Sequence, residues 1–152
     1  MMKISIGSDH AGYELKKNVN ILLIKKNIEI IDFGPNGPDS VDYPDYGKMV
    51  ALSVLSKESS SGIVICGTGL GMSIVVNRFP GIRGTLCSDV LSARMSRQHN
   101  DSNLLVLAGR MIGQTLADEI VQTWLDTSFE GGRHQRRIDK IENVHKMKQG
   151  EK

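Results

Sequence analysis

The fold is decided by the stretch Gly62-Ile63-Val64-Ile65-Cys66-Gly67-Thr68-Gly69-Leu70-Gly71. Its first half is apolar throughout and rich in β-branched residues, which is typical of a strand that is buried on both faces. Its second half places three glycines among five residues, at the point where such a strand must turn into the next helix. A strand with two buried faces needs helices on both sides of its sheet, so the stretch predicts an α/β fold.

Short β-branched runs alternate with amphipathic helical runs on both sides of this stretch. Strands are predicted at Lys3–Ile6, Ile28–Asp32, Gly62–Cys66, Thr85–Cys87 and Leu104–Leu107. After the first strand, apolar residues recur at helical spacing, at Leu15, Val19, Leu22 and Leu23. The alternation predicts a five-stranded parallel sheet with helices on both faces, in a single three-layer domain that spans residues 1–152.

Two more helices are predicted near the C-terminal end of the chain. The pair Thr115 and Asp118 resembles a capping box that opens a helix. That helix carries Leu116, Ile120 and Trp124. A last, basic helix is predicted to begin near Gln135, with Ile138, Ile141 and Val144 on one side.

The composition excludes several classes of protein. The 152 residues hold 19 Lys and Arg against 17 Asp and Glu, a net charge of +2, so neither nucleic acid nor an anionic membrane is expected as the main partner. No apolar run reaches the roughly 18 residues of a membrane helix. The N-terminal residues enter a strand pattern without the apolar region of a signal peptide. Because Cys66 and Cys87 both lie in apolar runs, we expect reduced thiols in a cytoplasmic protein.

Positive charge is concentrated in the last part of the chain. From Glu130 onward there are seven Lys and Arg against four Asp and Glu, a net charge of +3. Arg133 and Arg137 lie four residues apart, and like charges at that spacing destabilise a helix unless an anion bridges them. These two arginines, together with Arg110 after the fifth strand, are candidates for binding a phosphate through paired hydrogen bonds. The alternative is a solvated basic face.

The loops after the strands are the expected ligand site, because parallel α/β sheets bind ligands beyond the carboxyl ends of their strands. We expect the loops Ser8–Gly12, Gly67–Gly71 and Gly109–Gly113 there, together with the segment Arg97–Ser102. The loop Gly67–Gly71 is not a dinucleotide fingerprint, since Met72 stands where the last glycine belongs. It is either a tight turn or a nest of N–H groups for a phosphate or an oxyanion.

Cys66 directly precedes the glycine loop. Convergent N–H dipoles favour a thiolate, so Cys66 is a candidate nucleophile or proton carrier. Cys87 has no such surroundings and is expected to be a core residue.

The histidines differ in their surroundings. Asp9 and His10 end the first strand, and His99 and Asn100 lie in a polar segment where His99 is accessible. His134 and His145 are isolated and expected to face solvent. No group of His, Cys, Asp and Glu has the spacing of metal ligands, so no metal is expected.

Four separated motifs stand out along the chain. They are Gly7-Ser8-Asp9-His10-Ala11-Gly12, Ile65-Cys66-Gly67-Thr68-Gly69-Leu70-Gly71, Ser96-Arg97-Gln98-His99-Asn100-Asp101 and Glu130-Gly131-Gly132-Arg133-His134. From Lys3 to about Val144 the chain resembles type B ribose-5-phosphate isomerases, a family shared with the subunits of galactose-6-phosphate isomerase. The resemblance implies a Rossmann-like fold and aldose–ketose isomerisation of a sugar phosphate, with no metal or other cofactor. It also implies a homodimer, or a tetramer, whose sites combine residues of both subunits.

The resemblance further implies a role for each candidate residue. Cys66 would move a proton between C2 and C1 with the support of Thr68, while N–H groups of Gly67, Gly69, Leu70 and Gly71 would bind the enediolate oxygen. His99 would help to open the furanose ring, assisted by Asp9. Asn100 would bind sugar hydroxyls in a pocket lined by Tyr43. The phosphate would be held by His10, Arg110, Arg133 and Arg137. One branch of the family has a glutamate just after the glycine loop, where this chain has Met72, so the chain resembles the cysteine branch.

The expected reaction is the interconversion of ribose 5-phosphate and ribulose 5-phosphate. Isomerisation of a six-carbon sugar phosphate, such as allose or galactose 6-phosphate, is the nearest alternative. A non-catalytic sugar-phosphate-binding subunit would need the arginines but would have no use for both Cys66 and His99.

Overall fold

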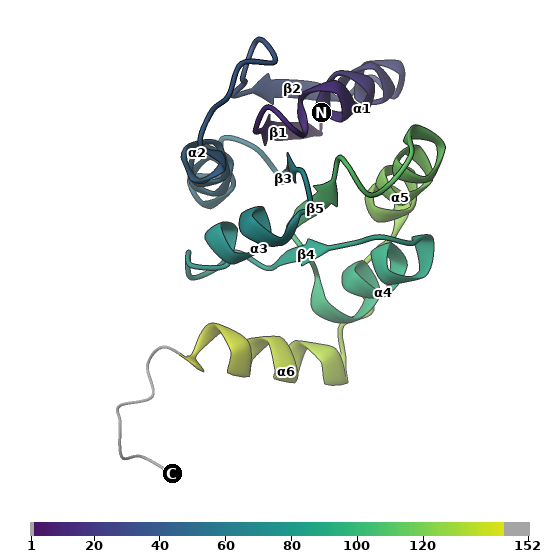
Figure 1. Ribbon diagram of the computed structural model, residues 1–152. Coiled ribbons are helices and arrows are strands. Elements are labelled where there is room, and N and C mark those ends of the chain that lie inside the picture. The colour runs from purple at the N-terminus through teal and green to yellow at the C-terminus, as the bar shows by residue number, and fades with distance from the viewer. Residues whose placement is uncertain (1, 145–152) are drawn as a thin grey trace.

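The computed structural model describes residues 2–144 and shows a three-layer α/β fold (Figure 1). The strands are β1 (Lys3–Ser8), β2 (Glu29–Asp32), β3 (Ser61–Cys66), β4 (Gly84–Leu86) and β5 (Leu104–Ala108). The helices are α1 (Tyr13–Lys25), α2 (Tyr43–Leu55), α3 (Leu70–Val76), α4 (Val90–Asn100), α5 (Gln114–Asp126) and α6 (Arg133–Glu142). All five predicted strands are present, with boundaries that differ by at most two residues from those predicted.

The five strands form one parallel sheet in the order β2-β1-β3-β5-β4. The strand β3 is therefore central, with β1 on one side and β5 on the other. The register pairs Ser8 with Ile65 and Cys66 with Ala108, so the carboxyl ends of the three middle strands lie side by side. The predicted parallel sheet is confirmed.

Helices cover both faces of this sheet, as predicted. Ile63 and Ile65 of β3 pack in a core cluster with α1 and α5, whereas Val64 and Cys66 pack on the opposite face with α2 and α3. Figure 1 shows α2 and α3 on one side of the sheet, with α1, α4 and α5 on the other. Each fully buried Ile or Val side chain contributes about 1.5–3 kcal/mol, so β3 is held from both sides. Within residues 2–144, no helix has the length and apolar content that a membrane span requires.

The predicted capping box is wrong. The helix α5 begins at Gln114, its N-cap is Gly113, and no side chain caps it. Thr115 therefore lies inside the first turn, and the Asp118 Oδ1 atom is buried without a hydrogen-bond partner among the described residues. A glycine can end the preceding loop in the extended conformation that an N-cap needs, so the helix begins two residues earlier than the Thr–Asp spacing suggests.

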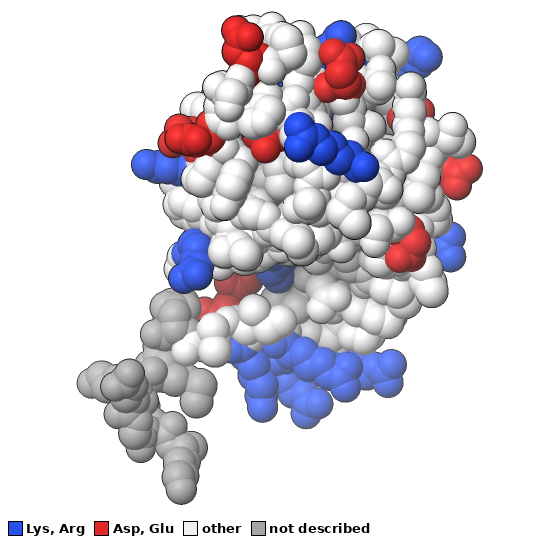
Figure 2. All heavy atoms as spheres, in the orientation of Figure 1, with Lys and Arg blue, Asp and Glu red and all other residues white. Residues whose placement is uncertain are grey.

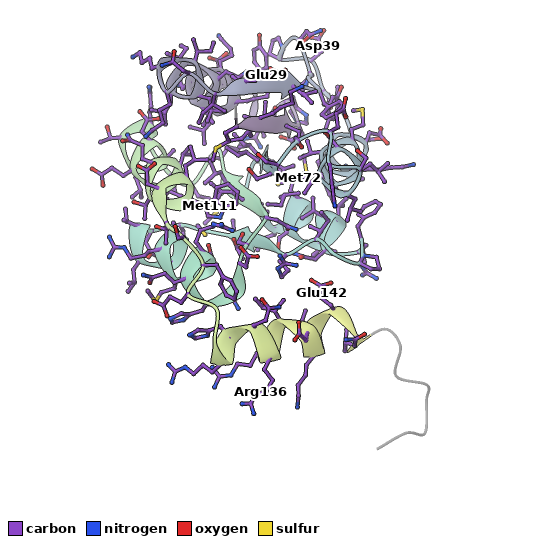
Figure 3. The ribbon with its side chains drawn as sticks, turned by 180° about the vertical axis from the view of Figure 1, so that it is seen from behind. Glu29, Asp39, Met72, Met111, Arg136 and Glu142 are labelled. Atoms are coloured by element: carbon purple, nitrogen blue, oxygen red, sulfur yellow. The ribbon has the colours of Figure 1, made fainter. Side chains whose placement is uncertain are left out.

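The helix α6 stands apart from the three layers and packs on the end of α4 (Figure 1). Glu142 points toward the rest of the molecule and Arg136 points away from it (Figure 3). The Glu142 carboxylate accepts hydrogen bonds from Arg83 Nη1 at 2.5 Å and from Gly81 N at 3.1 Å. Of the predicted apolar face, only Ile138 is buried, while Ile141 and Val144 remain 50% and 63% exposed. Part of this face therefore has no cover within the described chain.

Candidate active site

The glycine loop and Cys66 lie together at the carboxyl end of the central strand. Cys66 is the last residue of β3, and only 4% of it is exposed. Its carbonyl oxygen accepts a hydrogen bond from Gly109 N at 2.8 Å, and the next carbonyl, of Gly67, accepts one from Arg110 N at 2.9 Å. These bonds tie the loop after β3 to the loop after β5. The thiol is thus held on a rigid scaffold beside the start of the glycine loop.

The loop itself requires glycine at one position above the others. Gly69 has a φ of +74°, and a Cβ atom there would collide with Leu86. Leu70 N donates to Thr68 Oγ1 at 3.3 Å, so this exposed hydroxyl braces the loop where α3 begins. The left-handed conformation bends the backbone sharply from β3 into α3, which is the geometry of a nest of N–H groups.

Met72, the residue that replaces the glutamate of the other branch, points into the core (Figure 3). It is fully buried in the core on the α2 side of the sheet. It packs directly on Gly47, since a Cβ atom added to that glycine would lie only 2.9 Å from the Met72 sulfur. A thioether cannot accept a proton from carbon at neutral pH. Cys66 is therefore the nearest candidate base at this loop.

The end of β1 brings Asp9 and His10 to the same edge of the sheet. Asp9 N donates to Ile65 O at 3.1 Å, one residue before Cys66, and Asp9 Oδ1 accepts from Gly12 N at 2.9 Å. His10 Nδ1 accepts from Val41 N at 3.3 Å, which places the proton of the neutral ring on Nε2. Asp9 is almost fully buried, whereas His10 is half-buried.

Tyr43 and Arg110 complete this group. The ring of Tyr43, at the start of α2, lies against Gly71, because a Cβ atom added there would come within 2.6 Å of Tyr43 Cζ. Arg110 extends along Gly67, with its Cδ 3.5 Å from the corresponding Cβ position. The carboxyl edge therefore gathers a thiol, a carboxylate, an imidazole, a phenol and a guanidinium. This arrangement can bind a polyhydroxylated anion and move a proton on it.

The segment Arg97–Ser102 does not lie at this edge, contrary to our expectation. Arg83, which directly precedes β4, donates from Nε to the carbonyl oxygens of Asn100 and Asp101, both at 3.1 Å. His99 and Asn100 therefore lie at the amino ends of the strands. The reason is topological, since a helix between two parallel strands must return to the edge from which the next strand begins.

His134 is buried, which corrects the expectation that it faces solvent. Only 7% of its side chain is exposed, and its ring stacks on His99 with centroids 4.3 Å apart. Burial, followed by the positive charges of His99 and Arg133, lowers the pKa of His134, while Glu130 opposes this effect. His145 lies outside the described residues.

The stacking of the histidines also gathers three side chains that could bind a metal ion. The spacing of these residues in the sequence did not predict this cluster. Ligand atoms of His99, Glu130 and His134 lie within 4.8 Å of one another. The i, i+4 spacing of Glu130 and His134 is the signal that points to this cluster. The rings are inclined by only 8°, so the nitrogen lone pairs run in nearly parallel planes and do not converge on one point. The absence of a metal in the reaction stays a prediction.

Arg133 and Arg137 both lie on α6, at the same edge as His99. Figure 2 shows Lys and Arg side chains gathered over this helix. The exposed basic residues on it are Arg133, Arg136, Arg137 and Lys140. Within residues 2–144, no carboxylate lies within 4 Å of the Arg133 or Arg137 guanidinium. The structure thus divides the predicted site residues of one chain between two edges of the sheet.

Comparison with known proteins agrees with this architecture. A family model described as ribose/galactose isomerase matches residues 4–141. Ribose-5-phosphate isomerase B of Escherichia coli is 45% identical over 97% of this chain and 99% of its own length. A ribose-5-phosphate isomerase B of Clostridium thermocellum superposes with a TM-score of 0.94 at 54% identity, covering 95% of this chain and 98% of that one. The structure of a Thermotoga maritima ribose 5-phosphate isomerase superposes with a TM-score of 0.92 at 55% identity, covering 94% of this chain and 99% of that one.

Proposed function

The chain belongs to the ribose/galactose isomerase family, and on this premise we propose that it interconverts ribose 5-phosphate and ribulose 5-phosphate. The observation that carries the proposal is the position of Cys66. It is a buried thiol at the start of a glycine loop, at the sheet edge that also carries Asp9, His10 and Arg110, and no carboxylate stands at the alternative position, residue 72.

Cys66 is the base of the isomerisation. Its thiolate removes the proton from C2 of the open-chain aldose and the same group returns a proton to C1, while the O1 atom gains the proton that O2 loses. The intermediate is an enediolate, whose negative charge needs donors that are already in place. Thr68 braces the loop, and one well-placed N–H group contributes about 2.7–4 kcal/mol to such a step.

Ring opening precedes this proton transfer, because ribose 5-phosphate is mostly a furanose. A proton must reach the ring oxygen while one leaves the anomeric hydroxyl, and an imidazole that titrates near neutral pH suits the task. We assign this step to His99, with Asp9 assisting, and assign to Asn100 and Tyr43 the binding of the sugar. The phosphate, bound by His10, Arg110, Arg133 and Arg137, orients the reacting carbons.

A complete site on this proposal needs two chains. Cys66, His10 and Arg110 lie at the carboxyl edge, whereas His99, Arg133 and Arg137 lie at the amino edge. A symmetric homodimer brings the amino edge of one subunit to the carboxyl edge of its partner. Two apolar surfaces support such a contact, because Leu70 and Ile74 are 59% and 61% exposed on α3 beside the glycine loop, and α6 exposes Ile141.

The proposal is tested by incubating the protein with ribose 5-phosphate and following the appearance of ribulose 5-phosphate. Conversion that survives exhaustive chelation of divalent ions is expected, and activity that returns only with an added divalent ion would refute the metal-independent mechanism. Free thiols at Cys66 and Cys87 are consistent with a cytoplasmic enzyme.

Galactose in the description of the matching family favours one second candidate, the isomerisation of a six-carbon sugar phosphate such as galactose or allose 6-phosphate. Comparing kcat/KM for ribose 5-phosphate and the six-carbon substrates decides between them. A chain that binds these compounds but converts none of them would instead be a binding subunit.

A further inference from the structure

Glu130 lies beside the stacked histidines but takes no part in the reaction proposed above. Its Oε2 atom is 3.6 Å from His134 Nε2 and 4.0 Å from His99 Nε2. Both distances exceed those of a hydrogen bond, so the carboxylate acts on the two rings through its charge. It faces both rings at once, and it becomes attractive to them when either ring carries a second proton.

The segment around Glu130 is fixed at both ends. Glu130 N donates to Gln98 O at 3.1 Å, which attaches the segment to α4 one residue before His99. Gly131 and Gly132 follow with φ values of +68° and +57°, a conformation that only glycine adopts readily in succession. They turn the chain into α6 so that His134 stacks on His99. The carboxylate and the two rings are therefore held in one arrangement by α4, by α6 and by the segment between α5 and α6.

We propose that Glu130 is a positioning residue for His99, whose carboxylate stabilises the protonated histidine pair and keeps the His99 ring oriented for opening the sugar ring. The inference rests on the proposed function, since it assigns a supporting role to a residue of that site. A general acid must carry its proton and be correctly oriented before the substrate reacts. Stacking on His134 fixes the plane of the ring, and Glu130 is the negative charge that favours the proton.

The charges around the pair make this assignment specific. Arg133 and Arg137 on α6 both oppose protonation of His134, as does His99 itself. On α4, Arg97 is paired with Asp101 at 2.9 Å, so these two charges offset each other. Glu130 is the neighbour that raises the pKa of His134. Replacing it with glutamine should lower that pKa further.

The test compares Glu130→Gln with Glu142→Gln. Each variant removes one carboxylate on or beside α6. The Glu130 carboxylate faces the two histidine rings, whereas the Glu142 carboxylate binds Arg83 and Gly81 and contacts neither ring. We expect the pH midpoint of the His134 ring resonance, measured by NMR, to fall by about 0.5–1 unit in Glu130→Gln and to stay unchanged in Glu142→Gln. This titration does not depend on activity, so it tests the inference even if the wild type converts no ribose 5-phosphate.

Kinetics supply the second readout. Glu130→Gln should reduce kcat on ribose 5-phosphate about tenfold, less than the roughly hundredfold cost of a 1 Å misplacement. Erythrose 4-phosphate cannot form a furanose, so its turnover should be nearly unaffected. Glu130→Asp keeps the charge, so it should partly restore both the His134 midpoint and kcat. This recovery would show that the effects of Glu130→Gln come from the lost charge and not from poor folding. An unchanged His134 midpoint, or equal losses on the two substrates, would overturn the proposal.

Discussion

At the scale of single residues, the two cysteines differ in their immediate surroundings. Both are buried, but Cys66 directly precedes a glycine loop, whereas Cys87 directly follows β4 and its Sγ donates to Thr85 O at 3.7 Å. Burial is the main cause that raises the pKa of Cys87, so it remains a thiol at neutral pH. The same side chain is therefore proposed as a base at one position and acts as a small core residue at the other.

This contrast supplies a matched pair of variants. Cys66→Ala should abolish the exchange of the C2 hydrogen of the substrate with deuterium from solvent, because the base is removed. Substrate affinity should remain nearly the same, since the phosphate contacts are intact. Cys87→Ala should exchange at the wild-type rate despite a loss of stability from the small cavity. Isotope exchange followed by NMR measures both. Wild-type exchange in Cys66→Ala would contradict the assignment of the base.

The role of His99 can be separated from that of Cys66 by choosing the substrate. His99→Asn should slow the turnover of ribose 5-phosphate much more than that of erythrose 4-phosphate, which needs no opening of a furanose ring. Steady-state rates on the two sugars, compared with the wild type, are the measurement. If both rates fell by the same factor, His99 would act at a later step.

At the scale of elements, α6 is a basic helix that the rest of the chain holds by few contacts. The side chains of His134, Ile138 and Glu142 attach it to α4 and to the segment before β4. Its arginines are exposed, and their mutual repulsion is relieved when an anion binds between them. The helix is thus suited to present Arg133 and Arg137 to a phosphate outside its own chain.

Arg137→Ala should therefore raise KM for ribose 5-phosphate by about one to two decades, because a charge-assisted hydrogen bond contributes roughly 1.5–3 kcal/mol. Inorganic phosphate should also inhibit this variant more weakly than the wild type. Arg136→Ala is the control, since Arg136 lies on the same helix but points away from the molecule (Figure 3). Equal KM values for the wild type and Arg137→Ala would make α6 only a solvated basic face.

At the scale of the whole molecule, the division of the site between two edges of the sheet is the main feature. The polar groups around Cys66 and those around His99 are each gathered at their own edge, and the sheet separates them. A chain of this design is inactive alone on the mechanism proposed here. On the same mechanism, we expect activity only when a second copy supplies the missing half.

Complementation tests this directly. Cys66→Ala and His99→Asn, each expected to be inactive, should recover activity when they are mixed, unfolded and refolded together. Half of the dimers are then mixed, and each has one site with both residues intact, so about a quarter of the wild-type activity is expected. Mixing without refolding is the control for subunit exchange. No recovery after refolding would show that each site is built within one chain.

Much of the fold follows from local pattern. The apolar residues of β3 predict a strand buried on both faces, and the structure has helices on both of its sides. Asp9, Cys66 and Arg110 lie at or just after the carboxyl ends of their strands. This predicts that they share one edge of the sheet, since parallel strands end together. These inferences succeed because the burial of a strand and the edge at which it ends can be predicted from short stretches of sequence.

The tertiary structure alone decided three other matters. It placed His99 at the amino edge, buried His134 against it, and brought Glu130 beside both rings. The position of His99 follows from the return of α4 to the amino edge of the sheet. The contacts of His134 and Glu130 with His99 are not encoded by the period of the sequence, because they join α4 to a distant part of the chain and depend on how α6 turns after Gly131 and Gly132. Sequence patterns report which side of an element is apolar, whereas the meeting of two elements depends on the packing of the whole domain.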